Sequence, residues 1–185
     1  MAKPEQIGGQ VKSELDDFIA LCNELRPTSY LEIGAREGIA LRYFVERVPT
    51  ITHVTAVDLP GAEWGRAGSD AALDGNLEAL SAETWPIYAD SQALLTWSDV
   101  TRAHYRYDVV FIDADHSYEG VKRDFELYAP FANMIVALHD INHPPDSKAY
   151  GPTKLWNEID SWHQITKEFI DHDWGSRKGI GVIYV

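Results

Sequence analysis

DVVFIDADHSYEGVKRDF, residues 108–125, is the stretch of sequence that decides the fold. Its residues 109–112 are a short apolar, β-branched run, which is typical of a buried strand in a parallel sheet. Ser117 can cap the helix that follows, whose apolar positions recur at helical spacing. Three ionisable side chains, Asp113, Asp115 and His116, therefore lie where a buried strand turns into a helix. Ligands bind at this end of the strands in open α/β sheets.

Length and composition indicate one globular domain. The chain has 185 residues, of which 45% are hydrophobic, and this is enough for a sizeable core. We expect a single domain over residues 1–185, with the helix of residues 1–28 packed on the core. No apolar run approaches the length of a membrane span. The net charge of -13 argues against nucleic acid or an anionic membrane as the main partner.

The cellular compartment is predicted from two further features. Cys22 is the only cysteine, so an intrachain disulfide cannot form. Residues 1–10 are polar and lack the apolar core of a signal peptide. Both features favour the reducing cytoplasm.

Apolar periodicity along the rest of the chain predicts alternating strands and helices. Strands are predicted at residues 30–33, 52–57, 86–89, 109–112, 134–138, 166–170 and 181–185. Helices are predicted at residues 11–25, 39–48 and 71–80, through 94–95, after Ser117, and from about 151–153, with a loop over residues 60–74. This order predicts an α/β fold, a Rossmann-like three-layer sandwich with a mostly parallel seven-stranded sheet and an antiparallel last strand.

One acidic residue falls at or near the end of each of five successive strands. These residues are Glu32, Asp58, Asp90, Asp113 and Asp140. Because the carboxyl ends of parallel strands meet at one edge of a sheet, the five residues would line one crevice. Asp58 could instead make a turn, and Asp90 could cap the next helix while also contacting a ligand.

The glycine loop after the first of these strands is a weak signal alone. Its pattern, Glu32-x-Gly34-x-x-x-Gly38, departs from the Gly-x-Gly-x-x-Gly dinucleotide fingerprint. It also lacks the Lys and Ser/Thr of a phosphate-binding P-loop. Glycines here would still let the backbone approach a ligand closely.

Taken together, these motifs resemble those of the class I S-adenosylmethionine-dependent methyltransferases. The resemblance is greatest to the small subfamily of macrolide-sugar O-methyltransferases and cephalosporin-hydroxylase-like proteins, and it covers residues 30–185. Its motifs are residues 31–34 with Gly38, Val57-Asp58, residues 89–91, 111–118, 138–140 and 179–182. The resemblance implies a soluble enzyme that methylates a hydroxyl of a small-molecule or glycan acceptor. The cofactor positions it implies are Glu32, Gly34, Gly38, Asp58, Asp90, Ser91 and Asp113.

The resemblance also implies a divalent metal site and a base. The metal positions fall on Asp113, His139 and Asp140, and the base position falls on His116. Relatives often have an acidic residue where His139 stands, so a cation softer than Mg²⁺ is expected to fit. A hydroxyl needs a base, a metal or both to react at neutral pH. Asp113 and His116 are therefore the expected catalytic residues.

Alternatives remain at several of these positions. Asp113 could be a structural cap, and His139 could be a packed, hydrogen-bonded histidine. Asp115 is expected to cap the helix or face water, and His143 and His163 are expected at the surface. At the level of function, a non-catalytic ligand-binding or assembly protein with the same fold is the main alternative, and an NAD-dependent oxidoreductase is a weaker one. An open acceptor face is expected, which a homo-oligomer could cover.

Overall fold

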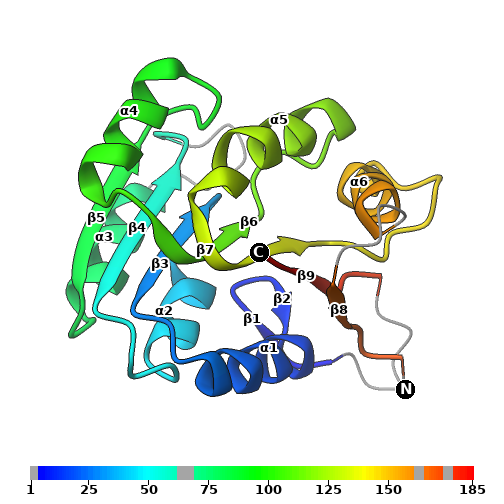
Figure 1. Ribbon diagram of the computed structural model, residues 1–185, viewed down its shortest axis with the longest axis horizontal. Coiled ribbons are helices and arrows are strands. Elements are labelled where there is room, and N and C mark those ends of the chain that lie inside the picture. Colours follow the sequence, from blue (N-terminus) through cyan, green and yellow to red (C-terminus); the bar gives the residue numbers. More distant parts are fainter. Residues whose placement is uncertain (1–3, 62–68, 161–164, 173–176) are drawn as a thin grey trace.

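A computed structural model describes residues 4–61, 69–160, 165–172 and 177–185. These residues form a seven-stranded sheet in the order β5-β4-β3-β6-β7-β9-β8 (Figure 1). The strands are β3 (Ser29–Ile33), β4 (His53–Asp58), β5 (Glu83–Tyr88), β6 (Tyr107–Ile112), β7 (Ala132–His139), β8 (Thr166–Phe169) and β9 (Ile180–Tyr184). The first five are parallel to one another, while β9 runs antiparallel to both β7 and β8. The predicted mostly parallel seven-stranded sheet with an antiparallel last strand is confirmed.

Helices cover both faces of the sheet, as predicted (Figure 1). The helices are α1 (Lys12–Leu25), α2 (Ile39–Val45), α3 (Ser69–Glu78), α4 (Leu94–Ala103), α5 (Tyr118–Tyr128) and α6 (Tyr150–Asp160), with a 3-10 turn, η1 (Ala129–Phe131). The buried side chains of α1, α2 and α3 join one apolar cluster, and those of α4, α5 and α6 join another. Successive residues of the central strands alternate between the two clusters, because side chains along a strand point to opposite faces. This burial on both faces explains the continuous apolar runs in the sequence.

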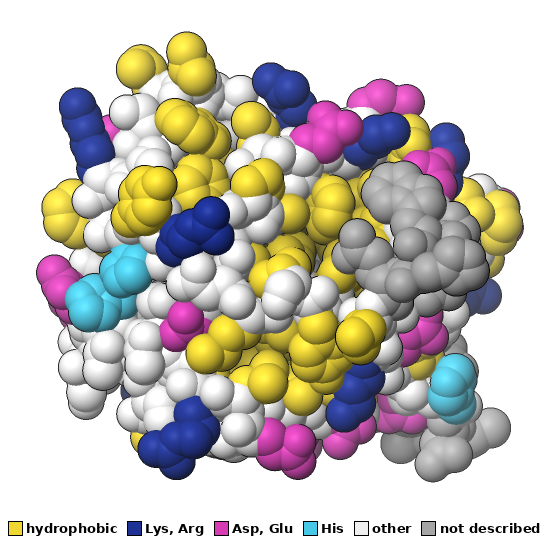
Figure 2. Space-filling view, in the orientation of Figure 1, with side chains coloured by type: hydrophobic (Ala, Val, Ile, Leu, Met, Phe, Trp, Pro, Cys, Tyr) yellow, Lys and Arg dark blue, Asp and Glu magenta, His cyan; other side chains and the backbone are white. Residues whose placement is uncertain are grey.

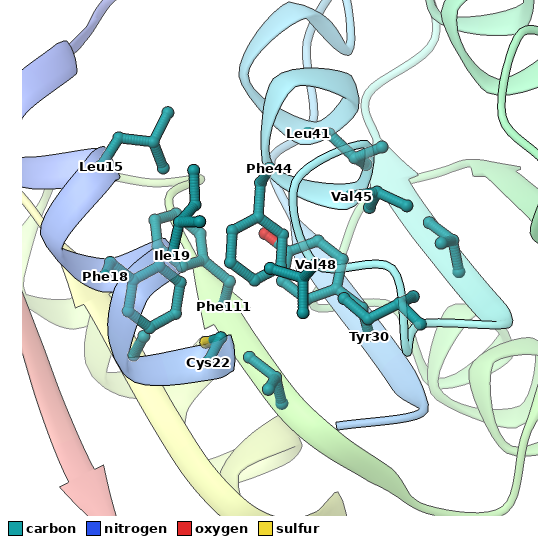
Figure 3. Close-up of a cluster of buried hydrophobic side chains, with 14 of the residues drawn as sticks. Leu15, Phe18, Ile19, Cys22, Tyr30, Leu41, Phe44, Val45, Val48 and Phe111 are labelled. Atoms are coloured by element: carbon teal, nitrogen blue, oxygen red, sulfur yellow. The ribbon is translucent and has the colours of Figure 1, made fainter. Parts of the chain in front are cut away.

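Aromatic rings form the centre of the first cluster, between α1, α2 and the sheet (Figure 3). Phe18 of α1 stacks on Phe44 of α2 with ring centroids 5.2 Å apart. Tyr30 of β3 lies 4.7 Å from Phe44, centroid to centroid. Helix α1 is thereby packed on the sheet, and the Tyr30 hydroxyl extends from this cluster toward the end of β3.

Some predicted element boundaries differ from those in the structure. Helix α3 begins at Ser69, inside the predicted loop of residues 60–74, because Leu73 and Leu77 are buried against the sheet. Residues 62–68 of that loop lie outside the described residues, as does His163. Strand β5 begins three residues earlier than predicted and contains Pro86, which an edge strand tolerates.

The N-terminal segment contains a hairpin that the sequence analysis missed. Strands β1 (Gln6–Ile7) and β2 (Gln10–Val11) pair antiparallel around Gly8 and Gly9. Two residues of Gly-Gly between short strands are a hairpin signal, although strands of two residues are too short to show periodicity. The hairpin directly precedes α1 and lies beside α2.

Hydrophobic side chains also reach the surface. On the face shown in Figure 2, they gather over the part of the molecule where α4 lies. The large exposed hydrophobic residues of α4 are Leu94, Leu95 and Trp97. Among the described residues, no helix is long and apolar enough to cross a membrane. The structure is of a single chain, so the homo-oligomer stays a prediction, as do the single domain over residues 1–185 and the cytoplasmic location.

Candidate active site

A cavity of about 910 Å³ opens at the carboxyl edge of the parallel strands. All five strand-end acidic residues predicted to meet there line it: Glu32, Asp58, Asp90, Asp113 and Asp140. Gly34, Gly38, Ser91, His116 and His139 line it as well. The volume suits a ligand of nucleoside size or larger. The structure therefore brings every predicted site residue to the same cavity.

The glycine loop forms one wall of the cavity through two left-handed backbone conformations. Gly34 has a φ of 95° and packs against the backbone of Asp113 and Ala114, where a side chain would not fit. Gly38 has a φ of 73°, and a Cβ there would lie 2.7 Å from Cδ1 of Leu73. Gly34 therefore requires glycine, and the left-handed backbone of Gly38 favours it. The loop thus holds β3, β6 and α3 close together and leaves its own backbone facing the cavity.

Glu32 is a buried acid held by a single described side-chain partner. The Tyr30 hydroxyl donates to its Oε2 at 2.6 Å. Burial raises the pKa of Glu32 to about 8, although the hydrogen bond from Tyr30 opposes the rise. The fold therefore places a costly carboxyl group in the cavity wall, which is typical of a ligand-binding position.

Asp58 lies at the end of β4, where burial raises its pKa and the backbone N–H groups of Arg36 and Leu59 oppose the rise.

Asp90 does not cap α4, contrary to one interpretation of the sequence. The residue before α4 is Ala93, which makes no side-chain cap, and Asp90 Oδ1 instead accepts from the backbone N–H of Gln92 at 2.9 Å. Asp90 therefore shapes the loop after β5.

Ser91 makes two hydrogen bonds with side chains of α5. Its hydroxyl donates to Asp124 Oδ1 at 2.7 Å, and its carbonyl accepts from the hydroxyl of Tyr128 at 2.5 Å. Burial raises the pKa of Asp124 to about 6. Helix α5, which begins next to His116, thus also positions the loop at the other end of the cavity.

Three residues at the ends of β6 and β7 form a tight polar cluster. Nδ1 of His139 lies 3.0 Å from Oδ1 of Asp113 and 3.2 Å from Oδ1 of Asp140. One ligand atom from each of the three residues lies within 4.8 Å of the others, as a shared cation would require. Asp140 has a left-handed backbone with φ 59°, which is uncommon outside glycine and typical of functional sites.

The same cluster contains His116, whose two ring nitrogens face two carboxylates. Nε2 lies 3.3 Å from Oδ1 of Asp113, and Nδ1 lies 3.4 Å from Oδ2 of Asp140. The hydrogen bond with Asp113 raises the pKa of His116, and partial burial opposes this. His116 is also the most exposed member of the cluster and the one best placed to meet a second ligand.

The charges in the cluster support one another. Burial alone would raise the pKa values of Asp113 and Asp140, but the charge of His139 outweighs it and holds both below their usual values. Burial alone would lower the pKa of His139, but the two carboxylates raise it to about 9. In the absence of a ligand, His139 is therefore the positive group between two negative ones.

Two further predictions at this site have clear outcomes. Asp115 faces away from the cluster to the helix start, where its Oδ1 accepts from the backbone N–H of Ser117 at 2.7 Å, as predicted. His143 is only partly exposed, so the prediction of a surface position is met in part. Its Nε2 is buried and lies 3.5 Å from Oδ1 of Asp140. Thr153 draws the loop inward, because it accepts from the His143 N–H and donates to the Asp140 carbonyl.

Sequence reasoning also missed Gln10. This residue of β2 lines the cavity, and its Nε2 donates to Oδ2 of Asp113 at 3.4 Å. Gly8-Gly9 before it is a turn signal that could have revealed the hairpin, although not its place over the cavity.

The chain belongs to the methyltransferase-domain family, whose family model matches residues 31–141. It is accordingly an enzyme of the S-adenosylmethionine-dependent methyltransferase class, with the Rossmann-like fold of that class. No curated protein sequence matches the chain.

Solved O-methyltransferases share the fold at low sequence identity. A putative O-methyltransferase from Klebsiella pneumoniae is 14% identical, with a TM-score of 0.71 over 96% of this chain and 82% of that one. An O-methyltransferase from Bacillus cereus, solved with SAH, is 14% identical, with a TM-score of 0.67 over 94% and 81%. O-methyltransferase TomG from Streptomyces achromogenes, involved in tomaymycin synthesis and solved with SAM, is 11% identical, with a TM-score of 0.66 over 92% and 78%.

Proposed function

We propose that this enzyme methylates a hydroxyl group of a small-molecule or glycan acceptor. The observation that carries the proposal is the meeting of Asp113, His116 and Asp140 in a cavity that the glycine loop also lines. S-adenosylmethionine supplies a methyl group on a positively charged sulfur, and its transfer to oxygen leaves S-adenosylhomocysteine. The protein must hold the hydroxyl in line with that methyl group and remove its proton.

The residues present fit S-adenosylmethionine. The glycine loop leaves its backbone open to the cavity at Gly34 and Gly38, on the side we assign to the methionine part and the ribose. Asp58 at the end of β4 is placed to accept the ribose hydroxyls, a common role for an acid there. Asp90 and Ser91 would border the adenine, and Glu32 and Asp113 line the same cavity.

The residues present also fit a divalent cation. Asp113, His139 and Asp140 would hold it, and the buried Oδ1 of Asp140 faces ring nitrogens of His139 at 3.2 Å and His143 at 3.5 Å. A cation there would orient the hydroxyl and lower its pKa. Because imidazole suits first-row ions such as Co²⁺ or Zn²⁺ better than Mg²⁺, we infer that the site prefers one of these softer ions.

We assign the role of general base to His116. Its ring lies between the carboxylates of Asp113 and Asp140. The His116 side chain is more exposed than those of the two aspartates, so it can turn one ring nitrogen to an incoming hydroxyl. Asp113 and Asp140 then stabilise the imidazolium that forms when the proton moves to the ring.

The test is methyl transfer from isotopically labelled S-adenosylmethionine to a panel of sugar and phenolic hydroxyls, detected by mass spectrometry. We expect transfer by the wild type and a loss of about a hundredfold or more in His116→Gln. The variant should still bind S-adenosylhomocysteine, which separates the base from cofactor binding. Cofactor binding with no transfer to any acceptor would instead favour the non-catalytic protein.

A further inference from the structure

Gln10 lies in the cavity because the N-terminal hairpin packs over the glycine loop. A Cβ on Gly8 would lie 2.7 Å from the backbone nitrogen of Ala40, and one on Gly9 would lie 3.4 Å from Nη1 of Arg36. Lys178 Nζ donates to the carbonyl of Gly9 at 2.6 Å and ties the hairpin to the segment before β9. Gln10 itself is only 4% exposed. The hairpin thus fixes one side chain in the wall of the cavity.

The chemistry of Asp113 determines which way the Gln10 amide points. An ionised carboxylate only accepts hydrogen bonds, so the group that faces Asp113 Oδ2 at 3.4 Å must be the amide nitrogen. The amide oxygen, Oε1, is then directed away from Asp113. It is buried and accepts no hydrogen bond from any described residue. A buried carbonyl oxygen without a donor is costly, which points to a donor that a ligand supplies.

We propose that Gln10 Oε1 accepts a hydrogen bond from the α-ammonium group of the cofactor's methionine part. This inference rests on the proposed function, because it takes S-adenosylmethionine as the ligand of the cavity. The hairpin packs on Arg36, which lies within the glycine loop that we assign to the methionine part, and on Ala40, just after that loop. A cation also suits this position, since Asp113 and Glu32 line the same part of the cavity. An acceptor hydroxyl is the other donor that could reach Oε1.

Gln10 would then have two roles. Its oxygen binds the ammonium group, and its nitrogen restrains the Asp113 carboxylate that faces His116 and His139. A cofactor that lacked the amino group would leave Oε1 unpaired and would be bound less tightly. Gln10 is therefore a specificity-determining residue for the amino-acid end of the cofactor.

The experiment compares two ligands by calorimetry. They are S-adenosylhomocysteine and its analogue without the amino group, 5′-deoxy-5′-(3-carboxypropylthio)adenosine. In Gln10→Met, which keeps an unbranched chain but has no amide, we expect affinity for S-adenosylhomocysteine to fall about tenfold, the loss of one charge-assisted hydrogen bond. Affinity for the analogue should change less than about twofold, because the lost partner is absent from it.

Gln92→Met is the matched control. Gln92 lines the same cavity at the end we assign to adenine, and its Nε2 donates to the carbonyl of Gly120 at 3.3 Å. This variant should change the affinity for both ligands by the same factor. Gln10→Ala, which cannot clash, provides the same comparison if Gln10→Met does not fold, as judged by thermal melting.

Three results would overturn the inference. Equal losses for both ligands in Gln10→Met would mean that Gln10 is only structural, and unchanged affinities would mean that Oε1 does not meet the ligand. In either case, an acceptor hydroxyl would become the donor to test. A wild type that binds neither ligand would overturn the proposed function, and this inference with it.

Discussion

Nδ1 of His139 lies 3.0 Å from Oδ1 of Asp113, although 26 positions separate the two residues. Strands β6 and β7 are parallel, and Ile112 is in register with Leu138, so the residues that follow them meet at the sheet edge. The cluster is therefore a product of strand register. Its function depends on what lies between these side chains.

Asp113→Asn should weaken binding of Mn²⁺ by about tenfold to a hundredfold. The substitution removes one charged ligand while preserving the shape of the side chain. Titration of Mn²⁺ followed by electron paramagnetic resonance measures this without any need for an acceptor. Asp115→Asn is the control, because Asp115 binds the helix start instead. Equal Mn²⁺ affinity in wild type and Asp113→Asn would rule out Asp113 as a ligand.

His139→Asp should shift metal preference toward Mg²⁺. It replaces an imidazole, which suits softer ions, with a carboxylate, which suits hard ones. The measurement is the ratio of Mg²⁺ to Co²⁺ affinity, by calorimetry, in wild type and variant. An unchanged ratio would show that His139 does not contact the ion and is a packed histidine instead.

The strands, their order and the acidic crevice were predictable because they depend on local sequence. Val109, Phe111 and their neighbours are apolar on both faces of a strand, and an acidic residue lies at or near the end of each of the five parallel strands. Parallel pairing then brings these acids together whatever the loops do.

Loop positions were not predictable in the same way. His143 enters the site because the left-handed backbone of Asp140 and the two hydrogen bonds of Thr153 fold its loop inward. Gln10 enters because the hairpin packs on α2. Each depends on contacts between residues far apart in the sequence, which apolar periodicity does not reveal.

Glu32→Gln should stabilise the protein and weaken cofactor binding. The folded-state pKa of Glu32, about 8, is above its ordinary value of 4.5, so wild-type stability falls as the pH rises from about 4.5 to 8. At pH 7 the variant avoids this cost, on the order of 3 kcal/mol, and its melting temperature should rise by roughly 6–12 °C. The amide oxygen can still accept from Tyr30.

Tyr30→Phe is a control for Glu32→Gln, because it should change the melting temperature in the opposite direction. It removes the hydroxyl that donates to Oε2 and leaves the buried carboxyl group without that bond. Its melting temperature should fall. A fall in melting temperature in both variants would mean that the ionisable side chain of Glu32 stabilises the folded protein, contrary to the prediction that it destabilises it.

Asp124→Asn should alter the pH dependence of stability. Burial, with the nearby charges of Asp115 and Asp90, raises the pKa of Asp124 from 3.8 to about 6. The wild type therefore loses stability as the pH rises from about 4 to 6, by about 3 kcal/mol, and keeps that loss above pH 6. Urea unfolding at a series of pH values should show a smaller loss in the variant.

The control for Asp124 is Asp146→Asn, which removes a charge from an exposed position. Its stability should follow the wild-type curve over the same pH range. If Asp124→Asn also follows that curve, Asp124 is ionised in the folded protein at no cost, and the argument from its burial is wrong.

The most direct test of the central claim is calorimetric titration of the wild-type protein with S-adenosylhomocysteine. We predict one site per chain with a dissociation constant on the order of micromolar, and a loss of about tenfold in affinity in Asp58→Asn. Absence of binding at millimolar S-adenosylhomocysteine, or tight binding of NAD in its place, would contradict the assignment of this cavity to the methyl-donor cofactor.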